Sequence, residues 1–371
     1  MQKKGLIILT VTNDLSFDQR MQRIAGVLAK NGYEVKLVGR SRKHSIPLEI
    51  LPYKQHRISC LSEKGKLFYL EYNLRLFWFL LFSKAAVYAA VDLDTLLPCT
   101  LVAKLKGKKL VFDAHEYFTE VPELTERHMI KAIWQSLANV CIPRVDKAYT
   151  VGNELANIFS KQYGILFETI LNAPEYIEPE KGREREWEGE AEIPLVIYQG
   201  ALNEGRGLPQ LIKAMQQVDA KLVLAGEGDW SKYLRQLTAE LKLESKVSFT
   251  GFIIPMDLPA FTKKATIACN LLEPKGLSYQ YSLANKFFDY IHAGIPQLCA
   301  DFIEYRQINL KYNIALLCNC EEDEIAQNLN KLLSDKHLYK QMEQNCAMAA
   351  QVYNLQHEEK KLLNIYQQLF T

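Results

Sequence analysis

The sequence predicts an α/β protein with two domains, each organised around a parallel β-sheet. Its 371 residues are too many for one ordinary hydrophobic core. In both halves, short apolar runs alternate with apolar residues at helical spacing, the pattern of strands joined by helices in a parallel sheet. A charged stretch, EYIEPEKGREREWEGEAEIP, separates the two halves. We therefore expect domains at residues 1–171 and 193–354, with residues 172–192 as a linker or surface excursion.

The first domain is expected to open on the buried strand GLIILTVT. A helical stripe closed by Gly32 follows, and YEVKLVG, KKLVFDA, KAYTVG and FETIL have the pattern of further strands. Positive charge precedes the first apolar run, but Asn13 and Asp14 interrupt that run and no cleavage site follows it. We therefore expect no signal peptide.

The most apolar region of the chain is Leu67–Val91. Glu71, Arg75 and Lys84 interrupt it, so an uninterrupted membrane span is not expected. One interpretation is a core helix that runs into a strand. The other is a helix lying against a membrane surface, because aromatic and basic residues alternate there.

The second domain repeats the pattern of the first. LVIYQGA, AKLVLAGEG, KVSFTGF and TIACNLL are expected strands, and helices should begin near Leu208 and Trp230. A short helix is expected within SLANKFFDYIHAGIPQL, residues 282–298, ended by Gly294 and Pro296. The tail at about 355–371 has the pattern of an amphipathic helix.

Composition excludes several classes of protein. The net charge is only +2, so we expect no nucleic-acid partner. The eight cysteines are mostly isolated, and Cys318 and Cys320 lack a usual zinc spacing, which favours thiols in a reducing cytoplasm. The loop after the first strand has no G-x-G-x-x-G, which argues against a nicotinamide dehydrogenase. The acidic run DLD at Asp92–Asp94 is interpreted as a helix start and not as a metal site.

Polar residues at the expected carboxyl ends of the strands are candidates for ligand binding. In YQGALNEGRGLPQLI, a strand ends near Gly200 and Arg206 precedes a helix, which suits an anion; the alternative is a surface loop in which Arg206 pairs with Glu204 or solvent. In LAGEGDW, Glu227 follows a strand between two glycines, and a simple turn is the alternative. On the helix of residues 282–298, Lys286 and Asp289 form either a ligand-binding stripe or a solvated ion pair.

The first domain has two such polar loops. In LVFDAHEYFTE, His115 lies near Asp113 and Glu116, so it either handles a proton or hydrogen bond of a substrate or is a satisfied loop histidine. In VTNDLSFDQRM, Asn13 and Asp14 follow the first strand and suit the hydroxyl groups of a ligand.

Together these stretches resemble the retaining GT-B glycosyltransferases, in particular family four, the glycosyl transferases group 1. YQGALNEGRGL, LAGEG, FTGF and LANKFFDYIHAGIP match in order, and VFDAHEYF matches in the first half. The resemblance implies the GT-B fold: two Rossmann-like domains whose parallel sheets face a central cleft. It also implies that the first domain binds the acceptor, that the second binds the nucleotide sugar, and that the C-terminal helix, about 355–371, packs back on the first.

The resemblance also implies roles for individual residues. Asp289, in place of the commoner Glu, would bind the ribose of the donor, while Arg206 and Lys286 would stabilise the departing diphosphate and His115 would orient the sugar. The other residues implied in donor binding are Ser282, Leu283, Ala284, Asn285, Gly200, Glu227 and Phe252. On the acceptor side they are Asn13, Asp14 and Glu116.

The chain departs from the family pattern at several positions. Tyr281 stands where a paired acid is usual, although Glu273 lies earlier. Ala201 stands where an arginine is usual, and Arg206 replaces the lysine that follows it. One of the two usual phosphate-binding cations is therefore missing from its place, and Lys286 is the residue expected to compensate.

The expected function is transfer of a hexosyl or related sugar, with retention, from a nucleoside-diphosphate sugar to an acceptor hydroxyl. The acceptor would be a glycan or lipid-linked saccharide in bacterial cell-surface polysaccharide or glycoconjugate synthesis. No metal or other cofactor is expected, and the expected location is the cytoplasm, with peripheral contact to the inner face of the membrane. Two alternatives stay open: a nucleotide-sugar epimerase of the same fold, and a non-catalytic sugar-nucleotide-binding partner, for which Ala201 and Tyr281 would be signs of decay.

Overall fold

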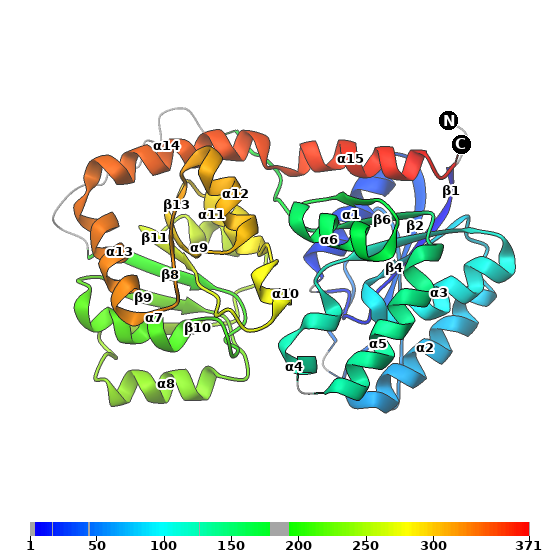
Figure 1. The fold of residues 1–371 in the computed structure, drawn as a ribbon, viewed down its shortest axis with the longest axis horizontal. Coiled ribbons are helices and arrows are strands. Elements are labelled where there is room, and N and C mark those ends of the chain that lie inside the picture. Colours follow the sequence, from blue (N-terminus) through cyan, green and yellow to red (C-terminus); the bar gives the residue numbers. More distant parts are fainter. Residues whose placement is uncertain (1–3, 17, 44, 126, 179–192, 371) are drawn as a thin grey trace. The chain divides into compact units, whose positions relative to one another are not determined.

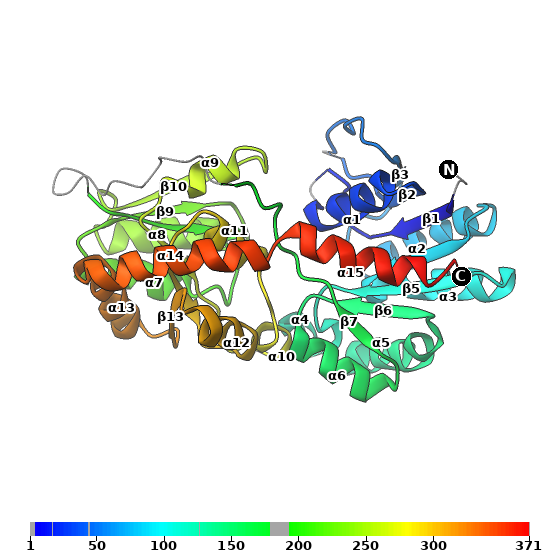
Figure 2. The ribbon, with the colours of Figure 1, turned by 90° about the horizontal axis from the view of Figure 1, so that it is seen from above.

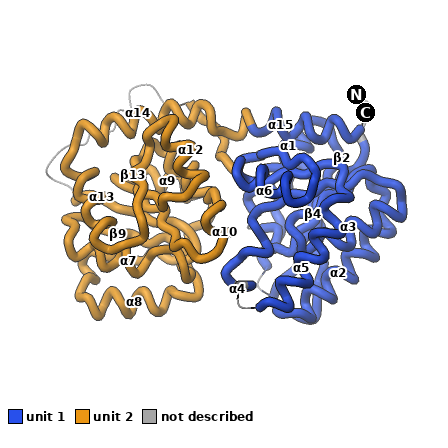
Figure 3. Tube along the Cα trace, viewed as in Figure 1, with its two compact units in different colours: residues 1–171, 358–371 blue, residues 172–357 orange. Residues whose placement is uncertain are grey.

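The computed structural model describes residues 4–16, 18–43, 45–125, 127–178 and 193–370. The chain forms two compact units (Figure 3): residues 1–171 with 358–371, and residues 172–357. Of the predicted linker, residues 172–178 belong to the second unit and residues 179–192 lie outside the described residues.

The first unit contains a seven-stranded sheet in the order β3-β2-β1-β4-β5-β6-β7, in which every neighbouring pair is parallel. Its strands are β1 (Lys4–Thr10), β2 (Tyr33–Arg40), β3 (Lys54–Ile58), β4 (Val87–Val91), β5 (Lys109–Ala114), β6 (Lys147–Thr150) and β7 (Phe167–Thr169). Its helices are α1 (Gln19–Lys30), α2 (Gly65–Leu81), α3 (Asp92–Lys106), η1 (Phe118–Glu120), α4 (Pro122–Thr125), α5 (His128–Cys141), η2 (Ile142–Arg144) and α6 (Asn153–Tyr163). The last helix, α15 (Leu355–Gln367), belongs to this unit from Glu358 onward and lies beside α1 in both views (Figures 1 and 2).

The second unit contains a six-stranded parallel sheet in the order β10-β9-β8-β11-β12-β13. Its strands are β8 (Leu195–Gln199), β9 (Lys221–Ala225), β10 (Val247–Gly251), β11 (Ile267–Asn270), β12 (Gln297–Ala300) and β13 (Ala315–Cys318). Its helices are α7 (Leu208–Ala214), η3 (Met215–Gln217), α8 (Ser231–Glu240), α9 (Leu258–Thr262), α10 (Leu277–Gln280), α11 (Asn285–His292), α12 (Ile303–Tyr312), α13 (Glu322–Ser334) and α14 (Lys336–Val352).

The predicted fold class is confirmed: each unit is a doubly wound α/β domain with a parallel sheet. In each sheet the strand order reverses beside the first strand, between β1 and β4 in one and between β8 and β11 in the other. Ligands of such sheets bind outside the carboxyl ends of the strands at this reversal. The loops after β8 and β11 are therefore the first place to look for a site in the second unit.

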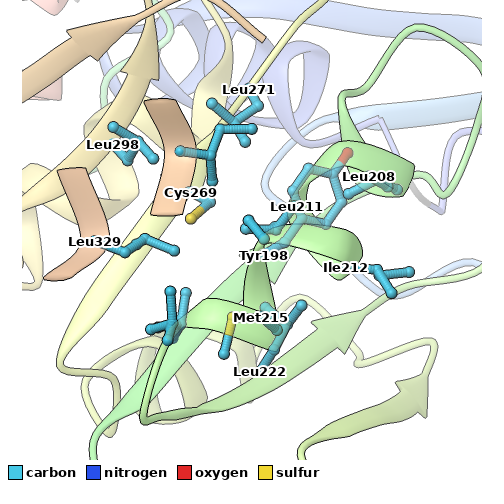
Figure 4. Packing of buried hydrophobic residues seen from close by; sticks show 14 of the residues in the cluster. Tyr198, Leu208, Leu211, Ile212, Met215, Leu222, Cys269, Leu271, Leu298 and Leu329 are labelled. Atoms are coloured by element: carbon cyan, nitrogen blue, oxygen red, sulfur yellow. The ribbon is translucent and has the colours of Figure 1, made fainter. Parts of the chain in front are cut away.

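The core of the second unit fixes the strand on which that site is built. Tyr198, at the end of β8, is 1% exposed and packs among Leu208, Leu211 and other apolar side chains (Figure 4). Its hydroxyl donates to the carbonyl of Ala201 at 2.9 Å, which ties the following loop to the strand. Core packing and this hydrogen bond thus fix the end of β8.

Helix α11 differs from its prediction at one end. It begins at Asn285, so residues 282–284 precede it, and Ala284 has extended backbone angles (φ −72°, ψ 142°). The N–H of Ala284 donates to the Tyr305 hydroxyl at 3.0 Å, which holds the chain in this approach to the helix. The other end is as expected, because Gly294 has a φ of 70° just past the last turn.

Helix α2 combines features of both interpretations of residues 67–91. Phe68, Tyr72, Leu76 and Leu80 are buried, as a core helix requires, and β4 follows it as a fully buried strand. The opposite side of α2 exposes large apolar side chains, among them Leu70 and Trp78. None of the helices in the described ranges is both long and apolar enough to cross a bilayer.

Candidate functional site

Two glycines shape the carboxyl edge of the second sheet. Gly200 follows β8 with a φ of 130°, and Gly226 follows β9 with a φ of 146°. The Gly200 N–H donates to the carbonyl of Ala225 at 2.9 Å. A Cβ on Gly226 would lie 1.9 Å from the carbonyl oxygen of Gly200, so only glycine fits there. These contacts lock the two loops together.

Two basic side chains of this edge, Lys286 and Arg206, lie over tyrosine rings, and Lys286 is also close to Gly200. The ammonium nitrogen of Lys286 is 3.7 Å from the ring centroid of Tyr198, and a Cβ on Gly200 would lie 3.5 Å from it. The guanidinium carbon of Arg206 is 5.1 Å from the ring centroid of Tyr279. Within the part of the chain that the structure describes, neither cation forms a salt bridge, and the buried Nε of Arg206 has no hydrogen-bond partner.

Among the described residues no salt bridge neutralises Arg206 or Lys286, although Asp289 attracts the Lys286 ammonium. Burial, and then repulsion by Arg206, lowers the pKa of Lys286 well below its usual range. Arg206 and the Lys286 amine are therefore held near each other without a salt-bridged carboxylate. A bound anion would favour the charged form of Lys286.

The acidic residues nearby are engaged elsewhere. Glu204 pairs with Lys275 at 2.7 Å and not with Arg206, and Glu273 pairs with the same lysine at 3.0 Å. Asp289 accepts a hydrogen bond from the Gln199 amide at 2.9 Å, and no salt bridge joins it to Lys286 among the described residues. Among the described residues there is therefore no Arg206–Glu204 and no Lys286–Asp289 salt bridge, while the alternative in which Arg206 meets solvent stays open.

Of the four residues predicted at the start of α11, three are already hydrogen-bonded through side chain or backbone. The Ser282 hydroxyl donates to the carbonyl of Tyr279 at 2.8 Å, and the Ala284 N–H is taken by Tyr305. Asn285 accepts from the side chain of Asn172. Leu283 is 6% exposed and packs inward. The start of α11 is thus preorganised, next to Lys286 in its first turn.

Glu227 and Phe252 lie at the ends of β9 and β10. Glu227 pairs with Arg235 at 2.7 Å, and hydrogen bonds from Arg235 and Ser231 lower its pKa. A Cβ on Gly251 would lie 3.6 Å from Glu227, and Phe252 is the next residue, largely exposed. The structure therefore brings these two predicted donor residues near each other on the β9 side of the reversal.

In the first unit, His115 lies between two carboxylates. Its Nε2 is 3.1 Å from Asp113, which pairs with the buried Arg20 at 2.9 Å. Its backbone N–H donates to Asp92 at 2.8 Å, and its Nδ1 is 3.6 Å from the other oxygen of Asp92. Burial lowers the pKa of His115, but Asp113 and Asp92 outweigh burial and raise the pKa to about 9. The raised pKa of His115 favours its protonated, hydrogen-bond-donating form near neutral pH, with Asp113 as the main cause.

The remaining predicted acceptor residues differ in their surroundings. The Asn13 side chain donates to Asp18 at 3.0 Å. Asp14 is 6% exposed and pairs with Arg57, so we expect it to shape the loop after β1. Glu116 lines a small cavity together with Asp92, at the ends of β5 and β4.

Several residues of the two sites were not anticipated from sequence. Tyr198, Tyr279 and Gln199 contact the predicted donor residues, and Asp92 and Arg20 complete the surroundings of His115. Asp92 has a φ of 54°, which is rare for a residue with a side chain, at the junction of β4 and α3. The acidic run DLD contained this residue, but only its place at a helix start could be read from the pattern.

Two doubly wound domains with parallel sheets occur in many classes of α/β protein, and the comparisons narrow the choice. Residues 183–347 match the family model of glycosyl transferases group 1, so the predicted resemblance is confirmed over this part of the chain. A protein of Methanocaldococcus jannaschii, named an uncharacterized glycosyltransferase, is 28% identical over 149 residues. That match covers 38% of this chain and only 36% of the relative's length.

Solved structures resemble the whole chain. The sucrose-phosphate synthase of Thermosynechococcus elongatus superimposes with a TM-score of 0.80 at 14% identity, covering 99% of both chains. HepE of Anabaena, solved in complex with UDP-glucose, has a TM-score of 0.76 at 15% identity, covering 98% of this chain and 100% of the other. At such low identity, these likenesses establish the fold.

Proposed function

We propose that this protein is a glycosyltransferase that uses a nucleoside-diphosphate sugar as donor. The observation that carries the proposal is the pair Arg206 and Lys286, two basic side chains that lie over tyrosine rings and form no salt bridge in the described part of the chain. They lie at the reversal of strand order where doubly wound sheets bind ligands. The family match over residues 183–347 and the UDP-glucose complex of HepE support the same reading.

The donor would be held by three kinds of contact. The diphosphate would meet Arg206, Lys286 and the start of α11, where backbone N–H groups and the helix dipole favour negative charge. Asp289 would accept hydrogen bonds from the ribose. As the bond from sugar to phosphate breaks, charge grows on the diphosphate, and preorganised cations stabilise it in the transition state. We propose that this arrangement makes a metal unnecessary.

His115 would donate a hydrogen bond to the transferred sugar. Because Asp113 favours the protonated form of His115, this side chain would donate a hydrogen bond to a sugar oxygen and would not serve as the base for the acceptor hydroxyl. That proton would pass to the leaving phosphate, which is consistent with transfer with retention. The acceptor class we propose is a glycan or lipid-linked saccharide of bacterial cell-surface polysaccharide or glycoconjugate synthesis, and the transferred group a hexosyl or related sugar.

We further propose that the first unit contacts the inner face of the membrane from the cytoplasm. Helices α2, α3 and α5 lie side by side (Figure 1), in that order by their contacts. Large apolar side chains are exposed on all three: Leu67, Leu70, Leu74 and Trp78, then Leu97, Leu101 and Leu105, then Met129, Ile133 and Val140. Exposed lysines flank α2 and the end of α3: Lys64, Lys66, Lys84, Lys104 and Lys108. An apolar face with a basic rim suits an anionic lipid surface.

Vesicle flotation tests this location. Vesicles containing phosphatidylglycerol should carry the protein at low salt, and pure phosphatidylcholine vesicles should carry less. Trp78→Ser should reduce flotation, since this ring is 51% exposed on the face. If the protein fails to float with anionic vesicles at any salt concentration, the membrane proposal is wrong and the transferase proposal is untouched.

The function is tested with a panel of nucleoside diphosphates and their sugars. A donor present at about 100 times its dissociation constant should stabilise the protein by about 2.7 kcal/mol in thermal unfolding. The stabilising donor is then incubated with saccharide acceptors and the products are analysed. A new glycoside supports the transferase; a sugar epimer formed without acceptor supports the epimerase; and binding without turnover across the acceptor panel supports the non-catalytic partner.

A further inference from the structure

We propose that Gln199 is a positioning residue that orients Asp289 toward the ribose hydroxyls of the donor. The inference rests on the proposed function, because it assumes that a nucleotide binds beside α11. Gln199 is the last residue of β8 and is 2% exposed, so its amide is a buried polar group that must be satisfied inside the protein.

Three contacts hold Gln199 between three elements. Its backbone N–H donates to the Tyr290 hydroxyl of α11 at 3.2 Å. Its side-chain oxygen accepts from Thr262 of α9 at 2.7 Å, and its side-chain nitrogen donates to Asp289 of α11 at 2.9 Å. Both ends of the amide are therefore used, and neither can rotate without losing a hydrogen bond.

The charge of Asp289 sets the direction of this hydrogen-bond chain. An ionised carboxylate only accepts, so the NH₂ group of Gln199 must face it and the amide oxygen must face Thr262. The Thr262 hydroxyl has one proton and two acceptors within 2.7 Å, the amide oxygen of Gln199 and the carbonyl of Leu258. With the amide oriented by Asp289, its oxygen and the Leu258 carbonyl share that proton.

This polarity determines what Asp289 can recognise. The amide fixes one carboxylate oxygen, and the carboxylate as a whole offers about four acceptor positions. A carboxylate held in this way binds hydroxyl donors and repels phosphate. The chain has Asp where the family usually has Glu, so the acid is one methylene shorter, and a rigid support from β8 fixes the position of this shorter side chain.

The test compares UDP with its 2′-deoxy and 3′-deoxy forms by calorimetric titration. Parent protein should bind UDP about 10-fold or more tighter than at least one deoxy form, as expected for a lost hydrogen bond to a charged group. In Gln199→Leu the ratio of the two affinities should fall below about threefold. The affinity of this variant for the weaker deoxy form should stay within about threefold of the parent's affinity for the same ligand. The matched control is Gln236→Leu, which removes an exposed amide that donates to Glu240 at 2.8 Å on α8 and should leave the preference intact.

A second variant separates positioning from simple packing. In Gln199→Glu two carboxyl groups face each other. The neighbouring titratable groups are Lys286 and the Tyr290 hydroxyl on α11 and Cys269 on β11. From α9, Thr262 contacts residue 199, and the basic Lys263 follows it directly. At about pH 8 repulsion should abolish the ribose preference, and at about pH 5.5 a shared proton should restore it. The parent, titrated over the same range, corrects for protonation of the nucleotide phosphate.

The outcomes distinguish the two proposals. If parent discriminates between UDP and its deoxy forms and both Gln199 variants do so equally at every pH, the positioning role is wrong and the nucleotide site stands. If UDP, GDP, ADP and CDP all fail to bind the parent protein, the proposed function is wrong and this inference falls with it. The assignment is supported if Gln199→Leu loses the preference for UDP over its deoxy forms. In Gln199→Glu the same preference should be lost at about pH 8 and regained at about pH 5.5.

Discussion

Replacing Lys286 by methionine should weaken nucleotide binding and remove a proton uptake that accompanies it. The ammonium lies over the Tyr198 ring and has no salt bridge in the part of the chain described. Burial and then Arg206 lower its pKa well below the usual range. A bound diphosphate would oppose both effects and raise that pKa again. Between the two pKa values, binding therefore takes up as much as one proton, and affinity falls as pH rises.

The size of the effect follows from the contacts. A charge-assisted hydrogen bond to phosphate contributes about 1.5–3 kcal/mol, so Lys286→Met should weaken binding roughly 10- to 100-fold. The cation–π contact with Tyr198 contributes about 2 kcal/mol at most when desolvated, and the methionine keeps the apolar stem. Because the lost contact is offset by removal of an unpaired charge, the free energy of unfolding should change by less than about 2 kcal/mol. The fold should therefore survive.

Calorimetric titration with UDP in two buffers of different ionisation enthalpy measures both quantities. The apparent binding enthalpy of the parent should depend on the buffer in the pH range between the pKa values of Lys286 in the free and the bound protein, and that of Lys286→Met should not. Lys232→Met, at an exposed position on α8, is the control and should behave like the parent. If Lys286→Met binds UDP as tightly as the parent and the parent shows no buffer dependence, the placement of the diphosphate beside Lys286 is wrong.

Three further predictions concern neighbouring features. Asp289→Asn should weaken nucleotide binding by about 1.5–3 kcal/mol with an unchanged melting temperature, measured by titration and calorimetry; equal affinity would leave Asp289 without a role at the ribose. The pKa of His115 is raised to about 9, so its contribution to stability is complete below about pH 6.5 and is lost as pH rises through about 9. The free energies of unfolding of parent and His115→Gln, measured with denaturant, should therefore differ most at low pH. Their difference should shrink by roughly a few kcal/mol as pH rises across this window. Gly226→Ala should destabilise the protein strongly because its Cβ would meet a backbone oxygen at 1.9 Å, while Gly26→Ala, with open space and a helical backbone, should stabilise it by about 0.5–1 kcal/mol in the same assay.

The alternation of apolar runs and helical stripes was sufficient to predict two parallel sheets, because strands buried on both faces are continuously apolar. β4, with five buried residues in VYAAV, is of this kind. β3 was not predicted, since KQHRI is polar and lies at the edge of its sheet with one fully buried residue. β12 and β13 were also missed, because each has four residues and a composition that suits a helix equally well.

The candidate site was only partly readable from sequence. Arg206, Lys286 and Asp289 stand out because their spacing relative to glycines matches a family pattern. The residues around them do not stand out in the sequence. Tyr198 and Gln199 have the pattern of ordinary strand residues, and only the folded structure brings α11 against β8. Tertiary contacts between distant segments have no periodicity, so they require the structure.

The central claim is that Arg206 and Lys286 form the phosphate site of a sugar-nucleotide donor, and the affinity of Arg206→Ala for UDP tests it most directly. Arg306→Ala removes an exposed arginine paired with Asp301 in the same unit and is the control. We predict that Arg206→Ala binds UDP roughly 10- to 100-fold more weakly than parent, that Arg206→Lys falls between them because it lacks the guanidinium fork, and that Arg306→Ala matches the parent. If UDP binds the parent and binds Arg206→Ala equally well, the phosphates are held elsewhere and the proposed site is wrong.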